Sequence, residues 1–448
     1  MQRIVVALGQ LNLAKRAYAV FAVCITTAML LPAQTLTTLH NFARTDGSNP
    51  APALVQATDG NLYGTTRHGG AESNGTVFKI SPTGTLTTLY NFCSQSGCTD
   101  GSVPTGLVQA TDGDFYGTTS QGGAGGFGTL FKIDPSGELT TLHSFCSPYS
   151  PHCTDGGHPT AVLVQAANAE LYGTTRSQGA HGHGTIFKIT QGGKLTTLYP
   201  FCSQTNCTDG EEPFAGLVQG ADGDFYGTAG VGGSGNDGGT VFKVTPSGTL
   251  TTLYSFCAQG FPCTDGLSPH AGLVQAANGE FYGTTFEGGA YSAGTVFKIT
   301  PNGTLSTVYS FCSQNLCRDG ANPEAAPIQA NNGDFYGTTI NSGANGGGTV
   351  FKITPTGKLT TLYSFCAQSG CTDGRFPDAG LVQASNGNFY GTTSQGGASD
   401  TVCDQGCGTV FSLSIGLGQI VKMLPASVEV ACRDFGNQSV RATSNALR

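Results

Sequence analysis

Eight histidines are the side chains in this sequence best suited to acid–base or metal chemistry at neutral pH. None of them lies at a recognisable spacing from a nucleophile or a carboxylate, and the sequence contains neither a Gly-x-Ser-x-Gly elbow nor a His-Glu-x-x-His motif. They follow no common register and are His40, His68, His143, His152, His158, His181, His183 and His270. The sequence therefore predicts no catalytic residues, and an enzyme would have to assemble its site from separate segments.

Cysteines supply the second kind of chemistry. Zinc needs about four ligands, whereas each close pair offers only two thiolates and no histidine recurs with the pairs along the chain. We therefore expect a disulfide within each pair and no metal. A bridge that closes so few residues contributes about 2 kcal/mol at most, so it should clip its loop rather than hold the fold together. Cys24 and Cys432 have no local partner. The pairs are Cys93/Cys98, Cys146/Cys153, Cys202/Cys207, Cys257/Cys263, Cys312/Cys317, Cys366/Cys371 and Cys403/Cys407.

A recurrent aspartate precedes a glycine shortly before each repeat begins. Carboxylates beside glycine turns are the usual surroundings of calcium, but the sequence contains no Asp-x-Asp-x-Asp run. Such a side chain more often caps its own turn. We expect turn capping and no cofactor, with calcium as the alternative. The residues are Asp46, Asp100, Asp155, Asp209, Asp265, Asp319 and Asp373.

These candidates belong to a tandem repeat. The segment GLVQASNGNFYGTT at 380–393 has close copies along nearly the whole chain, with spacings of 53, 56, 54, 56, 54 and 54 residues. We assign its tyrosine to packing between repeats and its glutamine to backbone hydrogen bonds, rather than to a ring of amides lining a channel. The tyrosines are Tyr63, Tyr116, Tyr172, Tyr226, Tyr282, Tyr336 and Tyr390. The glutamines are Gln56, Gln109, Gln165, Gln219, Gln275, Gln329 and Gln383.

One repeat, at 106–145, divides at its turn residues into four short strands. Asp-Gly at 112–113 and Pro-Ser-Gly at 135–137 suit tight turns, and a glycine-rich stretch at 121–128 separates the middle strands. Leu139 and Leu142 point to opposite faces of one strand, so each sheet must be covered on both sides. Sheets stacked face to face around a ring meet this need, and that arrangement is a β-propeller. A β-helix and an open stack of sheets are the alternatives.

The ends of the array predict how the ring closes. Residues 35–42 resemble a fourth strand with no first three before it, and residues 407–413 resemble a third strand with no fourth after it. If both belong to one blade, the ring has no exposed edge. The predicted fold is therefore all-β: a seven-bladed β-propeller over residues 35–415, with four antiparallel strands per blade.

The two ends outside the array carry separate predictions. Arg3, Lys15 and Arg16 precede the uncharged stretch AYAVFAVCITTAMLL, which predicts a secretory signal peptide over residues 1–34. An uncleaved anchor is the alternative, although this stretch is shorter than the ~20 residues of a membrane span. The tail at 416–448 is too short to bury a core of its own, and we expect it to be poorly ordered.

The repeat motifs DGNLYGTT at 59–66, GTVFK at 75–79 and LTTLY at 86–90 closely resemble the GloVer repeat, found in exported bacterial proteins and named for cyanobacterial and verrucomicrobial sequences. The resemblance spans roughly residues 35–413 and implies a surface or extracellular protein. The repeat register is also similar to that of the streptogramin B lyase propellers. In those enzymes an acidic residue would often follow the aromatic strand, whereas this chain has Thr-Thr there. The segment GQIVKMLPAS at 418–427 is similar to the start of an IPT/TIG domain.

Strand direction divides the loops of the predicted propeller between two faces. The tight turns lie on one face, and the glycine-rich and cysteine loops lie on the other, which we call the loop face. The loop face has all the length variation and most irregular aromatic and charged residues, so we expect any binding site there. The candidate residues are His68, Arg176, His181, His183, Phe214, Phe286, Glu287 and Tyr291.

Composition restricts the partners. The formal net charge is −8 and no run of Lys or Arg forms a basic stripe, which argues against nucleic acid. We expect a secreted or cell-surface monomer, without a membrane span after signal cleavage, that acts as a non-enzymatic binding module for a protein or polysaccharide. Tryptophan, the strongest stacking platform for sugars, is absent. The alternatives are a lyase or hydrolase with residues from several blades, and a purely structural surface protein.

Overall fold

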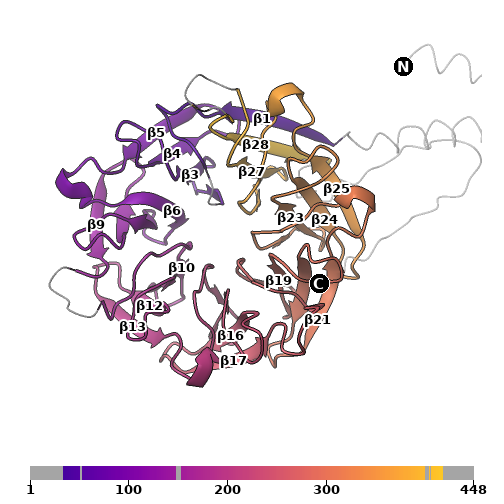
Figure 1. The fold of residues 1–448 in the computed structure, drawn as a ribbon. Coiled ribbons are helices and arrows are strands. Elements are labelled where there is room, and N and C mark those ends of the chain that lie inside the picture. The colour runs from indigo at the N-terminus through magenta and orange to yellow at the C-terminus, as the bar shows by residue number, and fades with distance from the viewer. Residues whose placement is uncertain (1–33, 51–52, 148–152, 399–402, 404, 417–448) are drawn as a thin grey trace, which may run out of the picture.

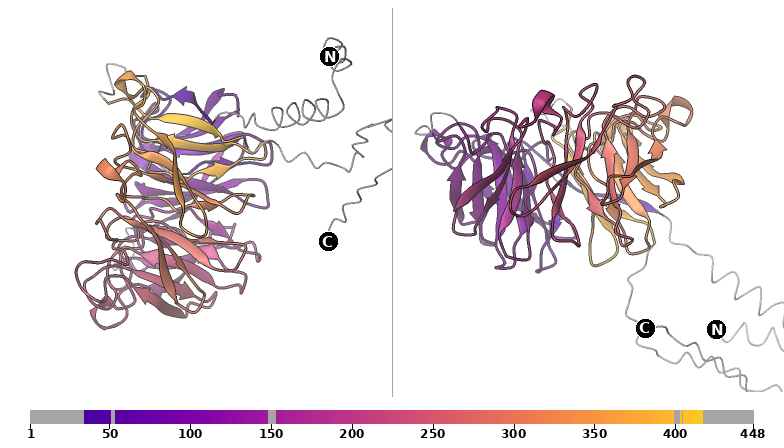
Figure 2. Two further views of the ribbon diagram at one scale, coloured as in Figure 1. Left: turned by 90° about the vertical axis from the view of Figure 1, so that its right-hand side faces the viewer. Right: turned by 90° about the horizontal axis from the view of Figure 1, so that it is seen from below.

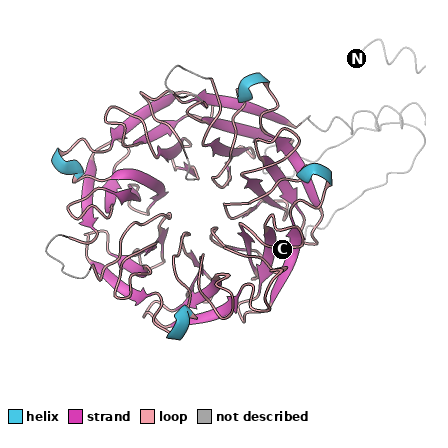
Figure 3. Cartoon of the chain, in the orientation of Figure 1, coloured by secondary structure: helices cyan, strands magenta, loops and turns pink. Residues whose placement is uncertain are grey.

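The computed structural model describes residues 34–50, 53–147, 153–398, 403 and 405–416. Its strands form seven four-stranded antiparallel sheets, arranged as the blades of a ring (Figure 1). Side views show a flat disc with the short helices on one side, which is the loop face (Figure 2). These 3-10 helices are the only helices in the described ranges (Figure 3): η1 (Ser96–Cys98), η2 (Thr205–Cys207), η3 (Asn315–Cys317) and η4 (Ser369–Cys371). The predicted all-β seven-bladed propeller is confirmed.

Each blade uses its strands in the predicted order, from the axis outwards. The first strands are β2 (Val55–Gln56), β6 (Ser102–Gln109), β10 (Val164–Gln165), β14 (Val218–Gln219), β18 (Val274–Gln275), β22 (Ile328–Gln329) and β26 (Val382–Gln383). The second are β3 (Leu62–Thr66), β7 (Phe115–Gln121), β11 (Leu171–Thr175), β15 (Phe225–Ala229), β19 (Phe281–Thr285), β23 (Phe335–Thr339) and β27 (Phe389–Thr393). The third are β4 (Thr76–Ile80), β8 (Thr129–Ile133), β12 (Thr185–Ile189), β16 (Thr240–Val244), β20 (Thr295–Ile299), β24 (Thr349–Ile353) and β28 (Thr409–Ser414). The fourth are β5 (Leu86–Asn91), β9 (Leu139–Ser144), β13 (Leu195–Pro200), β17 (Leu250–Ser255), β21 (Leu305–Ser310), β25 (Leu359–Ser364) and β1 (Thr35–Asn41).

The last blade is built from both ends of the array. Blades 1 to 6 are β2–β5, β6–β9, β10–β13, β14–β17, β18–β21 and β22–β25, and blade 7 combines β26–β28 with β1. Strand β1 pairs with β28 from Thr35 opposite Ser414 to Asn41 opposite Thr409. Figure 1 shows the two strands side by side at the outer edge of the ring. The predicted closure by the N-terminal strand is confirmed.

Aromatic side chains fill the space between neighbouring blades. Tyr63 is 1% exposed and its ring stacks on Phe115 of blade 2 with centroids 4.2 Å apart. Farther out, Phe92 meets Phe131 edge-on at 5.1 Å. Because both faces of a blade are covered in this way, its strands can be apolar on both sides. The assignment of the repeated tyrosine to packing between repeats is confirmed.

The repeated glutamine links one blade to the next. The Gln56 Oε1 accepts a hydrogen bond from the backbone N–H of Ser385 in blade 7 at 2.8 Å, and its Nε2 donates to the Gly60 carbonyl at 3.3 Å. Gln109 binds the backbone N–H of Thr58 in the same way. The glutamine therefore satisfies backbone groups, as the sequence predicted.

All seven predicted disulfides are present, but they occupy two kinds of loop. Six lie between a fourth strand and the next first strand: Cys93–Cys98, Cys146–Cys153, Cys202–Cys207, Cys257–Cys263, Cys312–Cys317 and Cys366–Cys371. The seventh, Cys403–Cys407, lies between β27 and β28, in the glycine-rich loop of blade 7. The predicted division of the loop face into glycine-rich loops and cysteine loops is therefore wrong for Cys403 and Cys407, because one loop is both.

The six bridges before first strands are not equivalent. Four of them close five residues, and each of those loops contains one of the 3-10 helices. Cys146–Cys153 and Cys257–Cys263 close seven and six residues, and no 3-10 helix is described in either loop. The bridge therefore tolerates loops of different length and conformation.

The second cysteine of a pair also holds a neighbouring loop. The Cys153 carbonyl accepts a hydrogen bond from the Gly179 N–H at 2.9 Å, and the Cys263 carbonyl accepts one from the Gly289 N–H at 2.9 Å. Both glycines belong to glycine-rich loops. Cys263 is 4% exposed, and Cys407 is 2% exposed and belongs to the same buried cluster as Phe42. Each bridge joins residues of one loop, as predicted, and it is the backbone carbonyl of the second cysteine that holds the neighbouring loop.

The recurrent aspartate caps its loop, as predicted. The buried Asp100 carboxylate accepts hydrogen bonds from the Tyr90 hydroxyl at 2.9 Å and the Ser94 N–H at 3.0 Å. In two blades a histidine occupies the position of that tyrosine. His40 lies 2.9 Å from Asp46, and His143 lies 2.9 Å from Asp155. The statement that no histidine follows the repeat register is therefore wrong for these two.

A pair of buried threonines joins the second and third strands. The hydroxyls of Thr66 and Thr76 lie 2.9 Å apart, and both side chains are fully buried. Corresponding pairs occur in every blade but blade 4. There Ala229 replaces the first threonine, and the buried Thr240 hydroxyl has no partner among the described residues. Such an unsatisfied hydroxyl costs about 1–3 kcal/mol.

We expect Ala229→Thr to stabilise the propeller by about 1 kcal/mol, because the new hydroxyl can pair with Thr240 as in the other blades. Chemical denaturation would measure the change. The matched control is Thr285→Ala in blade 5, which breaks such a pair and should destabilise by a similar amount. A lower stability for Ala229→Thr would contradict this account.

Removal of residues 35–42 should open blade 7, lower the melting temperature and cause association through the exposed edge of β28. Loss of the buried Phe42 alone is worth about 3 kcal/mol. The control is a permuted chain in which residues 36–42 are moved to the C-terminal side of Ser414 and joined to it by a copy of the turn at 355–358. This turn should fit, because Leu36 pairs with Leu413 in blade 7 as Leu359 pairs with Ile353 in blade 6. If the truncated chain melts and elutes like the full one, closure by β1 is unimportant.

Candidate binding site at the loop-face end of the propeller axis

A cavity of about 600 Å³ lies at the centre of the ring, and residues from all seven blades line it. Its wall consists of backbone and small side chains around the first strands. Its larger side chains come from two places, the residue that follows a second strand and the segment that precedes a first strand. Both places lie toward the loop face, because second strands run to that face and first strands start from it.

One position of this segment, the residue after a proline that recurs in every blade, differs in chemistry from blade to blade. In blades 3 to 7 it lies between a buried proline and an alanine, and in blade 2 between proline and glycine. The proline and alanine are held by packing, whereas the residue between them lines the cavity. We call it the lip position. Its occupants are Thr105, Thr160, Phe214, His270, Glu324 and Asp378. Different blades therefore contribute chemically different side chains to the cavity wall.

The aromatic side of the cavity is a continuous row of rings. The Phe214 and His270 ring centroids are 4.5 Å apart, and His270 stacks on Phe286 at 5.0 Å with an interplanar angle of 20°. The Arg176 guanidinium lies 4.4 Å from the centre of Phe214, and Glu212 binds it at 3.0 Å. Burial, with Arg176 nearby, lowers the pKa of His270, so its imidazole is neutral at pH 7.

Gly230 makes room for Phe214. It follows the second strand of blade 4, where Arg67 and Arg176 stand in blades 1 and 3. A Cβ added to Gly230 would lie 2.5 Å from Cδ2 of the Phe214 ring. The glycine and the phenylalanine therefore belong together, and the small residue lets the ring lie flat against its own blade.

The acidic side of the cavity comes from blades 6 and 7. The Asp378 side chain is only 10% exposed, and its Oδ1 has no hydrogen-bond partner among the described residues. Arg67 of blade 1 lies 3.9 Å from the other oxygen, Oδ2. Burial and the neighbouring Glu324 raise the pKa of Asp378 to about 7, although Arg67 opposes the rise. Burial also raises the pKa of Glu324. The site therefore holds a carboxyl that changes protonation near neutral pH.

The candidate residues from the sequence separate into distinct locations. Arg176 and Phe214 line the cavity, and Phe286 packs behind His270. The others lie outside it: His68 in a second pocket of about 270 Å³ between blades 1 and 7, Glu287 in a backbone bridge to Leu267, His181 and Tyr291 exposed on glycine-rich loops, and His183 beside Glu211.

Sequence reasoning missed Arg67, Glu324 and Asp378 as site residues and gave His270 no role. They are far apart in the chain, and no motif surrounds them. The available signal was the lip position itself, because aligning the repeats on their proline shows an acid, an imidazole and an aromatic ring in equivalent places.

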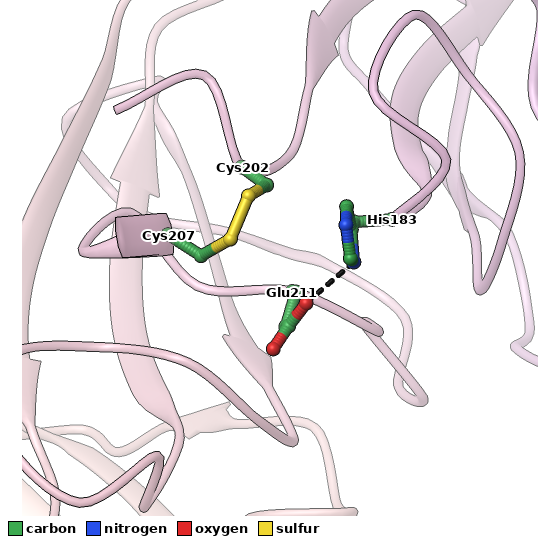
Figure 4. A group of neighbouring side chains, drawn as sticks. All are labelled: His183, Cys202, Cys207 and Glu211. Atoms are coloured by element: carbon green, nitrogen blue, oxygen red, sulfur yellow. Dashed lines mark ion pairs between the residues drawn. A yellow bond between two sulfur atoms is a disulfide. The ribbon is translucent and has the colours of Figure 1, made fainter. Parts of the chain in front are cut away.

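One cysteine pair has a histidine near it in space. His183 and Glu211 lie beside the Cys202–Cys207 disulfide, with one ligand atom of each residue within 4.8 Å of the others (Figure 4). The sequence counted two ligands for each cysteine pair, and at this loop His183 and Glu211 lie near enough to add two more. His183 precedes Cys202 by nineteen residues, so no short motif joins them.

The fold and the central cavity define a seven-bladed β-propeller with a candidate ligand site at one end of its axis. The Gloeobacter/Verrucomicrobia repeat matches residues 26–152, 96–261 and 257–426. The chain belongs to this repeat family.

The chain is similar to solved structures at low sequence identity. The extracellular domain of a putative hybrid two-component system, BT4673 from B. thetaiotaomicron, is 12% identical with a TM-score of 0.53, covering 85% of this chain and 39% of that one. A putative 6-phosphogluconolactonase from Bacteroides uniformis is 16% identical with a TM-score of 0.46, covering 76% and 95%. No curated protein matches the sequence. Among the described residues, no helix has the length and apolar character needed to cross a membrane.

We expect Asp378→Asn to stabilise the protein at pH 8 by about 2 kcal/mol, because a buried carboxylate becomes a neutral amide. A carboxyl whose pKa is raised on folding stabilises most below its unfolded value, near 3.8, and this contribution is lost as pH rises to about 7. The advantage of the variant should therefore shrink between pH 7 and pH 4.

Thermal unfolding across this pH range would measure the effect, with exposed Glu72→Gln as the control. A stability gain of Asp378→Asn that does not depend on pH, or a lower stability of this variant at pH 8, would show that the Asp378 carboxyl is not buried with a raised pKa.

Proposed function

We propose that the protein is an exported binding module that captures a neutral carbohydrate in the cavity at the loop-face end of its axis. The observation that carries this proposal is the lip position, where chemically different side chains from successive blades converge on one cavity. Because this position faces the cavity, its side chains can suit a ligand without disturbing the packing between blades. The cavity volume, about 600 Å³, lies in the usual range for small-ligand sites.

The lining is suited to hydroxylated rings. Phe214 and His270 offer a stacking surface, so the absence of tryptophan does not remove this means of sugar binding. Glu324 and Asp378 can bind hydroxyl groups opposite, and Thr105 and Thr160 add short polar groups to the wall. The arginine side chains are balanced by carboxyl groups, which favours a neutral ligand over an anion.

A protein partner is less well supported. A stable protein interface buries about 800 Å² on each partner, which is more than the mouth of one small-ligand cavity provides. Such a partner would have to contact the exposed loops instead, where His181 and Tyr291 lie.

Export is supported by two independent features. The first is the basic and then apolar N-terminal sequence, which lies outside the described residues. The second is the set of seven local disulfides, which are typical of an oxidising compartment. The extracellular location of the BT4673 domain agrees with this proposal.

A hydrolase is the second candidate. Two buried carboxyls with raised pKa and a neutral imidazole in one cavity are the kinds of group that general acid–base catalysis uses. This candidate shares the cavity and the substrate class with the binding proposal. It differs in requiring bond cleavage.

Calorimetric titration with neutral oligosaccharides of glucose, mannose, galactose and N-acetylglucosamine would test the proposal. We expect Phe214→Ala or Glu324→Gln to weaken binding at least tenfold, a loss of about 1.4 kcal/mol. His181→Ala and Tyr291→Ala lie on the same face outside the cavity and should leave the affinity unchanged.

If His181→Ala and Tyr291→Ala weaken sugar binding as much as the cavity variants do, the binding site lies on the exposed loops. Absence of binding to the whole panel would reject the carbohydrate and favour a protein partner or a structural role. Shortened sugars in the recovered solution would establish the hydrolase.

A further inference from the structure

The corner between blades 3 and 4 brings together four side chains that can bind a metal. His183 comes from the glycine-rich loop between β11 and β12, and Cys202, Cys207 and Glu211 come from the segment between β13 and β14. Figure 4 shows the imidazole, the carboxylate and the two sulfurs facing one small volume. It is the only such group found in the described part of the chain.

The backbone holds these four residues on a common frame. The Glu212 N–H donates to the His183 carbonyl at 3.1 Å, and the Cys202 N–H donates to the Gly210 carbonyl at 3.2 Å. Glu211 forms a two-way backbone bridge with Val231 of blade 4. Because the frame consists of backbone hydrogen bonds, it does not depend on the disulfide alone.

Equivalent loops in the other blades lack the additional donors. The residue before the Gly-Thr of the third strand is a histidine only in blade 3, and the residue after the recurrent Asp-Gly is acidic only at Glu211. The Cys366–Cys371 loop, for example, has Gly347 and Arg375 at these places. The combination therefore does not follow from the repeat.

In the disulfide form the two sulfurs are bonded to each other and offer no thiolate to a metal. His183 Nδ1 then pairs with Glu211 Oε2 at 2.5 Å. Two electrons and two protons from a thiol or phosphine reductant would open the bridge to two thiols. These thiols also exist in the new chain before the bridge forms.

We propose that the dithiol form of this corner is a site for Zn²⁺, bound by Cys202, Cys207, His183 and Glu211. Two thiolates, one imidazole and one carboxylate are a four-ligand set that zinc accepts in tetrahedral geometry. Binding would release one proton from each thiol, and reoxidation would return both electrons to an oxidant and expel the metal. Glu212, the residue after Glu211, binds Arg176 of the central cavity, so one segment carries both the metal ligand and the partner of a cavity residue.

Cobalt(II) titration of the full chain, without oxygen and with a phosphine reductant, would test the site. We expect one Co²⁺ per chain, with a near-ultraviolet thiolate-to-cobalt band and the intense visible bands of tetrahedral cobalt. The oxidised protein should show neither. His183→Ala and Glu211→Gln should each weaken cobalt binding at least tenfold, whereas replacement of both Cys366 and Cys371 by serine should leave it unchanged.

Absence of the thiolate band in the reduced wild type would overturn the proposal. So would a band that His183→Ala and Glu211→Gln do not weaken, since any reduced cysteine pair would then suffice. Circular dichroism of each sample would confirm that the reduced chain is folded.

Alkylation provides a second test. In the reduced chain with Zn²⁺ and without oxygen, so that no disulfide can form, we expect Cys202 and Cys207 alone to resist iodoacetamide, as read by peptide mass, with protection lost in His183→Ala. Equal alkylation of all pairs would contradict the site. Neither experiment involves a carbohydrate, so its outcome is independent of the proposed ligand in the central cavity.

Discussion

The packing of one blade against the next is the interaction on which this structure depends. No blade can bury its two apolar faces alone, so each relies on both neighbours. The repeated tyrosine stacks on a phenylalanine of the following blade at five of the seven junctions, with ring centroids 3.9–4.3 Å apart. At the other two, Tyr116 and Tyr390 meet Leu171 and Leu62. Every blade has a neighbour on both sides only if the ring is closed. The pairing of β1 with β28 completes blade 7 and so closes the ring.

This dependence also determines where the molecule is free to vary. Tyr, Gly, Thr and Phe recur because each meets the same partner in the next strand or blade. The lip position has no single partner that recurs from blade to blade, and it faces the space around the axis. The six described lip positions bring side chains from distant parts of the chain within reach of a single ligand. The propeller thus converts a uniform repeat into a non-uniform site.

The loop face carries two kinds of polar arrangement. The recurrent aspartates before the first strands are saturated by tyrosine, histidine and backbone donors, so they stabilise the loops. By contrast, one carboxylate oxygen of Asp378 has no hydrogen-bond partner among the described residues. His183 and Glu211 place two possible metal ligands beside one disulfide, and the equivalent loops lack this pair. Asp378 lines the central cavity, whereas His183 and Glu211 lie in the corner between blades 3 and 4.

The sequence alone determined the seven blades, the four strands of each, the closure by residues 35–42, the pairing of the cysteines and the face that carries the irregular loops. These features follow from spacing, turn residues and unfinished ends, which are local properties of the chain. Only the tertiary structure decided which irregular residues meet. Arg67 and Asp378 are more than 300 residues apart and approach because the ring closes between blades 7 and 1. His183 reaches Cys202 and Glu211 because adjacent loops lie side by side, a proximity that no spacing in the sequence encodes.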